Sequence, residues 1–266
     1  MIVYYLRMEF VREYIKLIIE INAHIRLRIV GNGVTDFAKE CLDMVSEVDN
    51  PAKYCDQFIP IFANYLKDVE RLCDPMAGSC KIGMIRDFGF KGKIWCNEIE
   101  PEFIKMYYVN KYAILISNRD AANMWGYNDE CFDGICTSPT YGNRLADWWD
   151  RHDNSKRISY GFALGRRPVS ENTAGMHWGD KYREKSYAIW KEQYRLLCKN
   201  GILICNVSDF IKDHKIVPVV EFHRNTLMDL GLSLTQELII PTQRMRFGQN
   251  WEARVDGEHI LIFAKE

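Results

Sequence analysis

The chain lacks a long apolar run, and this absence limits where it can act. No apolar run reaches the roughly 18 residues needed to cross a lipid bilayer. The opening segment Met1–Tyr5 is followed by Arg7, Glu9 and Arg12, which does not resemble a secretory signal. We therefore expect a cytoplasmic protein that has no membrane partner.

An excess of one charge is also missing. The 266 residues include 35 Lys and Arg against 36 Asp and Glu, which gives a formal net charge of −1. Binding to nucleic acid would therefore need a local basic patch rather than a basic surface overall. Hydrophobic residues make up 47% of the chain, enough for one large domain with a buried core.

Cysteines and histidines at the spacing typical of metal ligands are also missing. Cys131 and Cys136 have no second pair at zinc spacing, and the histidines show no ligand spacing, so we predict no metal site. The cysteine total of nine is odd, which favours reduced thiols over a disulfide framework. Several lie inside apolar runs and are expected to be buried: Cys73, Cys96, Cys136 and Cys205.

The pattern along the chain predicts a helical extension followed by an α/β domain. Residues 1–50 show helical periodicity and no assignable motif, and residues 51–266 form the predicted domain, opening with a helix over 52–67. From residue 69 onward short apolar runs alternate with helical stretches, which is typical of a doubly wound, mostly parallel sheet. The expected strands are 72–73, 93–96, 113–116, 134–136 and 202–205, the expected helices are 80–88, 101–111 and 181–199, and 234–240 with 259–263 form an antiparallel edge.

A tight turn follows the first expected strand. Asp74 ends that strand, and Gly78 lets the backbone approach a ligand closely. Asp74 is suited to accept a hydrogen bond from the ammonium group of an amino-acid moiety. An ordinary strand-to-helix turn with an aspartate cap explains the same residues, so this turn alone identifies nothing.

Two further acids follow the next two strands. Glu98 comes 24 residues after Asp74, where a carboxylate can accept hydrogen bonds from both ribose hydroxyls of a nucleoside cofactor. Asp120 follows the third strand and is placed to lie beside an adenine. The carboxyl ends of parallel strands form one crevice, so the three acids together predict a nucleotide-like site.

The segment Ser138–Tyr141 carries the second candidate chemistry. The amine of a nucleobase is a poor nucleophile, because its lone pair is delocalised into the ring. The Ser138 hydroxyl and the Pro139 carbonyl are two acceptors that can draw its hydrogens. Tyr141 offers a face on which a flipped base can stack, worth roughly 1–3 kcal/mol.

Together, Asp74–Cys80 and Thr137–Tyr141 resemble the signatures of amino-methylating DNA methyltransferases, which use S-adenosylmethionine. The resemblance covers roughly residues 53–265 and implies a class I methyltransferase, Rossmann-like fold. By this resemblance the cofactor contacts are Tyr54, Asp74, Pro75, Ala77, Gly78, Glu98 and Asp120; the base contacts are Ser138, Pro139 and Tyr141; and further substrate contacts are Arg144, Trp148 and Trp149.

Two residues depart from the family pattern. Cys80 stands where the family usually has glycine, and Thr140 replaces a second proline. By the same resemblance, serine rather than aspartate before Pro139 implies cytosine N4 rather than adenine N6 as the methylated amine.

Residues 142–180 form the expected target-recognition loop. This loop carries six Lys and Arg against five acids, with aromatic residues between the arginines, a mixture suited to an unstacked strand. A solvated loop whose aromatic residues pack on the core would have the same composition.

The resemblance implies DNA with a flipped target base as the partner. It leaves open a companion restriction endonuclease and an oligomer. Other activities also remain open: methylation of adenine N6, of RNA or of a protein glutamine, and a catalytically silent module that binds the cofactor.

Overall fold

The computed structural model describes residues 49–147, 159–242, 255 and 257–266. The predicted helical extension at 1–50 therefore lies almost wholly outside the described residues. Among the helices that are described, none is long and apolar enough to cross a membrane.

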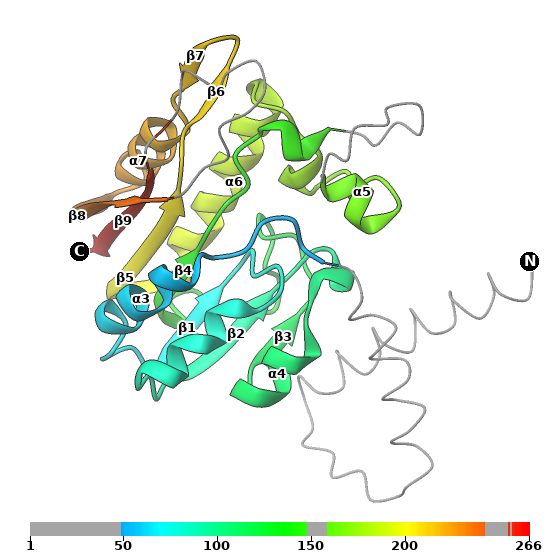
Figure 1. Ribbon diagram of the computed structural model, residues 1–266. Coiled ribbons are helices and arrows are strands. Elements are labelled where there is room, and N and C mark those ends of the chain that lie inside the picture. The colour runs from blue at the N-terminus through cyan, green and yellow to red at the C-terminus, as the bar shows by residue number, and fades with distance from the viewer. Residues whose placement is uncertain (1–48, 148–158, 243–254, 256) are drawn as a thin grey trace, which may run out of the picture.

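A seven-stranded sheet forms the centre of the domain, in the order β3-β2-β1-β4-β5-β9-β8 (Figure 1). Strands β1 to β5 run parallel, whereas β9 is antiparallel to both β5 and β8. This confirms the predicted doubly wound, mostly parallel fold with an antiparallel edge. The strands are β1 (Arg71–Asp74), β2 (Lys93–Asn97), β3 (Leu115–Ser117), β4 (Phe132–Thr137), β5 (Leu197–Val207), β8 (Leu232–Pro241) and β9 (Gly257–Lys265).

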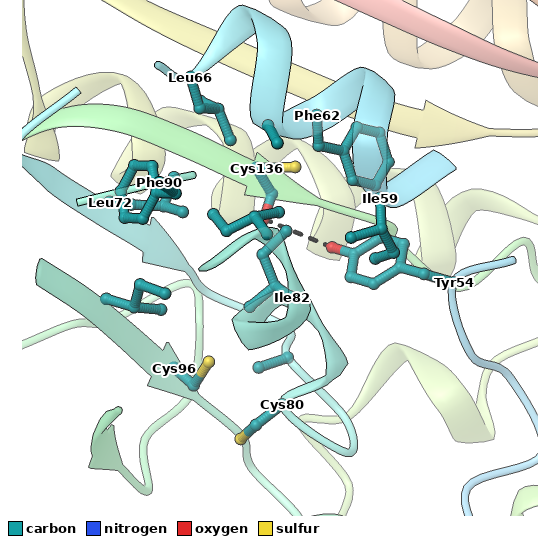
Figure 2. Packing of buried hydrophobic residues seen from close by; sticks show 14 of the residues in the cluster. Tyr54, Ile59, Phe62, Leu66, Leu72, Cys80, Ile82, Phe90, Cys96 and Cys136 are labelled. Carbon is teal, nitrogen blue, oxygen red and sulfur yellow. Dashed lines mark hydrogen bonds between the residues drawn. The ribbon is translucent and has the colours of Figure 1, made fainter. Parts of the chain in front are cut away.

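Alternating side chains of the central strands build a core on each face of the sheet. Leu72 packs on one face and its neighbour Cys73 on the other, and Leu203 and Ile204 divide in the same way. On the first face the partners are α3 (Ile59–Tyr65), the 3₁₀ helix η2 (Lys81–Phe88) and α4 (Met106–Tyr112), as Figure 2 shows in part. On the second face they are α6 (Asp180–Leu196) and α7 (Val219–Asp229).

The expected helices exist, but several differ in type or extent. The helix expected over 52–67 is a short turn, η1 (Asp56–Phe58), followed by α3, which starts with Pro60 in its first turn. Residues 81–88 form a 3₁₀ rather than an α-helix, and the stretch 101–111 divides into η3 (Pro101–Phe103) and α4. The prediction that the last helix reaches residue 199 was wrong, because Leu197 already pairs with Phe132 in the sheet.

Two α-helices and a β-hairpin are among the elements that were not predicted. Helix α7 covers the second face, α5 (Tyr160–Leu164) lies in the expected recognition loop, and a hairpin of β6 (Phe210–Lys212) and β7 (Lys215–Val217) follows β5. In Figure 1 this hairpin projects beyond the end of the sheet.

Candidate active site

A cavity of about 1340 Å³ opens at the carboxyl ends of the parallel strands. Its walls combine the loops that follow β1, β2, β3 and β4 with the segment 50–54 and the β6–β7 hairpin. The expectation that these loops share one crevice is therefore confirmed. Of the residues predicted from the sequence, the lining includes Tyr54, Pro75, Ala77, Gly78, Glu98, Asp120, Ser138, Pro139 and Tyr141.

Asp74 lies behind this wall rather than in it. Its side chain is fully buried and accepts hydrogen bonds from the Tyr54 hydroxyl (2.8 Å) and from the Met76 backbone N–H (3.2 Å). The Tyr54 hydroxyl also lies 3.4 Å from the carbonyl oxygen of Cys136, as the dashed line in Figure 2 marks. Burial raises the pKa of Asp74 to about 6, because hydrogen bonds only partly replace the lost hydration of the carboxylate.

Two features favour glycine at position 78, in the turn after β1. Its φ of 53° lies in the left-handed region, and a Cβ there would come within 2.2 Å of the Asn50 side-chain nitrogen. Cys80 also adopts a left-handed conformation, with φ of 62°, and its side chain is fully buried. This conformation explains why glycine suits that position in the related signature, and shows that this turn accommodates a thiol instead.

Glu98 connects the first two loops. Its carboxylate accepts the backbone N–H of Gly78 (2.7 Å) and that of Glu100 (2.9 Å). Burial raises the pKa of Glu98 to about 7. Each carboxylate oxygen has a second lone pair, so the group can still accept hydrogen bonds from a ligand in the cavity.

Two asparagine side chains join these loops to the loop after β3. The buried Asn97 amide donates to the carbonyl oxygens of Pro75 (3.0 Å) and Arg119 (2.9 Å). The Asn118 amide donates to the carbonyl of Glu98 at 2.6 Å. These bonds fix the loops relative to one another before any ligand binds.

Asp120 faces the cavity from the loop after β3, but it is not a free carboxylate. One oxygen lies 2.5 Å from the Lys185 ammonium of α6, and the other accepts the backbone N–H of Ala122. A role beside an adenine remains a prediction for this residue.

The turn after β4 presents the second set of predicted groups. The Ser138 and Tyr141 hydroxyl oxygens are 3.4 Å apart. The Gly142 carbonyl accepts the backbone N–H of Trp178 at 2.8 Å, and the Thr140 carbonyl accepts a hydrogen bond from the Tyr182 hydroxyl. Contacts from helix α6 and the segment before it thus hold the turn from outside.

Part of the expected recognition loop packs against the domain. Arg166 pairs with the fully buried Glu100 (2.6 Å) and with Glu102 (2.8 Å), so this arginine is already committed within the protein. Tyr160 is buried against Phe103, with ring centroids 6.1 Å apart.

The substrate contacts predicted in this loop stay predictions. Arg144 begins the short 3₁₀ helix η4 (Arg144–Ala146). Trp148 and Trp149 lie outside the described residues.

Several residues with a role at the site were missed by the sequence analysis. Glu100 anchors the loop at 166–172 through Arg166, the Val169 N–H (2.7 Å) and the Asn172 amide (3.2 Å). The sequence did contain a signal for Glu100, because it lies two residues after Glu98 in the same loop after a predicted strand. Tyr182 lies on a helix that we expected to be purely structural.

Comparison with known proteins shows no family for this chain. No protein-family model matches the chain, and no curated protein matches it. A methyltransferase from Pyrococcus furiosus is similar in structure, with 14% identity, a TM-score of 0.48, and coverage of 89% of this chain and 99% of that one. A SAM-dependent methyltransferase from Methanosarcina mazei has 13% identity, a TM-score of 0.48, and coverage of 77% and 97%.

A candidate DNA modification methylase from Thermus thermophilus is more distant. It has 16% identity and a TM-score of 0.34, and it covers 55% of this chain and 50% of that chain. Likenesses at these levels carry no conclusion about substrate, which depends on the residues of the site.

Proposed function

We propose that the protein is an S-adenosylmethionine-dependent methyltransferase that acts on an exocyclic base amine in DNA, cytosine N4 in the first instance. One observation carries the proposal: the glycine turn with its acid partner and the Ser138–Tyr141 turn line the same cavity. A methyl donor and a planar amine held at these two places would meet inside the same cavity.

The residues present fit the cofactor. Gly78, Glu98 and Tyr54 line the cavity, and the Tyr54 hydroxyl donates to the buried Asp74 behind it. S-adenosylmethionine supplies a methyl group on a sulfonium. The ionised carboxylates of Glu98 and Asp120 would accept hydrogen bonds from its polar groups, and those of Asp74 and Glu98 favour its positive charge.

The acceptor groups fit an amine. Among the described residues, no hydrogen bond reaches the Pro139 carbonyl, so this oxygen and the Ser138 hydroxyl can accept the two hydrogens of the amine. Bound S-adenosylmethionine would supply the methyl group, its carbon–sulfur bond breaking as the carbon–nitrogen bond forms, and the proton released from the nitrogen would pass to solvent. Positioning and electrostatics supply the rate in such a displacement.

The test is a methylation assay with isotopically labelled S-adenosylmethionine. Single-stranded DNA, duplex DNA, RNA and a protein extract are incubated separately, digested, and examined by mass spectrometry. Labelled N4-methylcytosine is the expected product. Labelled N6-methyladenine would change the base, and label only in RNA or in protein glutamine would replace DNA as the substrate.

A serine pair provides the matched control. Ser138→Ala should lower turnover at least about 100-fold and leave the cofactor Kd within about twofold, because the hydroxyl acts on the acceptor. Ser233→Ala removes a hydroxyl that bonds the exposed Glu266 and should change neither quantity. Equal losses of turnover and cofactor affinity in Ser138→Ala would contradict the assignment.

A further inference from the structure

Three buried polar side chains form a series that ends at the Ser138–Tyr141 turn. The Trp190 indole N–H donates to His223 Nδ1 at 2.8 Å, and His223 Nε2 lies 3.0 Å from the Tyr182 hydroxyl. The same hydroxyl bonds the Thr140 carbonyl oxygen. Trp190, His223 and Tyr182 are at most 1% exposed, and none of the three lines the cavity.

The chemistry of the groups fixes the direction of every bond in the series. An indole N–H can only donate, so His223 Nδ1 must accept, and the proton of the neutral ring therefore lies on Nε2. That N–H donates to the Tyr182 oxygen, whose own hydrogen is directed to the Thr140 carbonyl. One arrangement of hydrogens satisfies all four groups.

The histidine stays neutral in this arrangement. Burial lowers the pKa of His223 to about 3, and burial raises the pKa of the Tyr182 hydroxyl. At neutral pH both rings therefore keep the hydrogens that the series requires.

The series ends at the Thr140 carbonyl, which belongs to the Ser138–Tyr141 turn. The Thr140 carbonyl fixes the peptide plane that lies between the Pro139 carbonyl and the Tyr141 ring. Thr140 stands where the related signature has a second, rigid proline, so its backbone is less restricted than in that signature. The second external anchor is the Trp178 N–H on the Gly142 carbonyl, and the Trp178 ring packs on Tyr182 with centroids 5.4 Å apart.

We propose that Tyr182, His223 and Trp190 are positioning residues that hold the Thr140 peptide, and so orient the Pro139 carbonyl and the Tyr141 ring toward the substrate amine. Their hydrogen bonds restrict the backbone at Thr140, as a proline at this position would do in the related signature. The proposal rests on the proposed function, since it assigns these residues to the same turn.

The test uses the full chain with single-atom or isosteric changes. Tyr182→Phe removes the hydroxyl alone. His223→Gln keeps one acceptor and one donor, whereas His223→Leu keeps neither. Tyr65→Phe is the matched control, because its hydroxyl bonds Gln236 at 2.6 Å and does not line the cavity.

Two readouts are needed. The first is the single-turnover rate of methyl transfer beside the cofactor Kd. The second is hydrogen exchange of the peptide containing residues 138–143, which reports the turn whatever the substrate. Melting temperatures of all variants identify any global loss of stability.

In Tyr182→Phe and His223→Leu we expect the rate to fall about tenfold or more and exchange of the turn to rise by a similar factor, with the cofactor Kd within about twofold. His223→Gln should recover most of both quantities, and the double variant Tyr182→Phe/His223→Leu should be no worse than either single variant.

Unchanged turn exchange in Tyr182→Phe, or equal damage in His223→Gln and His223→Leu, would overturn the positioning role. A wild-type protein that binds the cofactor but methylates no substrate would instead refute the proposed function. Exchange of the turn would still decide whether the series holds it.

Discussion

Two buried carboxylates, Asp74 and Glu98, dominate the site at the scale of single residues. Their pKa values are raised to about 6 and about 7, chiefly by burial. A carboxyl group whose pKa is higher in the folded than in the unfolded state stabilises the fold at low pH. That contribution is lost as the pH rises through the folded-state pKa. The apo protein therefore keeps two groups whose ionised forms are costly in the absence of a ligand.

Asp74→Asn should make the apo protein more stable at pH 8 by about 1–3 kcal/mol, since the variant has no buried charge to ionise. The side-chain amide introduced by this change can donate to the Tyr54 oxygen, and the Tyr54 hydroxyl then turns to the nearby Cys136 carbonyl. Urea unfolding at pH 4 and pH 8 measures the effect, which should shrink toward pH 4. Cofactor affinity should fall in the same variant.

The exposed Asp68 supplies the control for this experiment. Asp68→Asn should leave both the free energy of unfolding and the cofactor affinity unchanged at either pH. A gain in Asp74→Asn that is as large at pH 4 as at pH 8 would argue against ionisation as its cause.

Gly78→Ala should weaken cofactor binding and destabilise the protein by more than about 1 kcal/mol. The new Cβ meets the Asn50 side chain as well as an unfavourable φ. Gly165→Ala is the matched control, with φ of 65° and no atom within 4 Å of the added Cβ. Calorimetric titration and thermal unfolding of both variants separate the effect of the contact with Asn50, which only Gly78→Ala creates, from the cost of the left-handed φ, which both variants share. Equal effects in the two variants would remove Asn50 from the explanation.

At the scale of elements, sequence periodicity predicted the central strands well and their connections less well. Leu72–Cys73 and Leu203–Cys205 are buried on both faces, so their continuous apolar character marks them as strands. Periodicity could not distinguish the 3₁₀ helix at 81–88 from an α-helix. The β6–β7 hairpin was missed because its short strands are largely exposed and carry no buried alternation.

The same limit applies to the site. The position of Gly78, Glu98 and Asp120 at the cavity was predictable, because each follows a strand of the parallel sheet. Tyr182 links His223 to the Thr140 carbonyl, and these three residues lie on different elements of the fold. Glu100 and Arg166 form an ion pair although they are 66 positions apart in the sequence. No spacing in the sequence indicates such contacts.

Arg166→Leu should release the loop around residues 166–172 and destabilise the protein by about 2–4 kcal/mol. The change leaves the buried Glu100 carboxylate without its charged partner. Limited proteolysis and hydrogen exchange across this loop, with urea unfolding, measure the result. Arg183→Leu is the control, because Arg183 pairs with the exposed Asp180 and should leave the loop unchanged. A loop equally protected in both variants would show that Glu100 does not anchor it.

At the scale of the whole molecule, charge balance limits how nucleic acid can be held. A net charge of −1 provides no long-range attraction for a polyanion. Among the lysines that line the cavity, Lys53 and Lys81 already pair with Asp49 and Asp56.

Under the proposed function, DNA binding should therefore depend only weakly on salt concentration. We expect log K to fall against log salt with a slope of about −2 to −4, corresponding to about two to five neutralised phosphates. Fluorescence anisotropy over a range of KCl concentrations measures the slope, and Arg166→Leu should not alter it. A slope steeper than about −7 would reveal a far larger basic surface than we infer.

The cysteines of the sheet have a consequence for handling the protein. Cys73, Cys96 and Cys136 are buried in adjacent central strands, and burial raises the pKa of each thiol well above its usual value. The thiolate is the nucleophile that attacks an alkylating reagent, so these three buried thiols are protected until the sheet opens, whereas Cys55 is exposed in the folded protein. The rate at which these three cysteines are alkylated therefore measures how often the central sheet opens, and no engineered cysteine is needed.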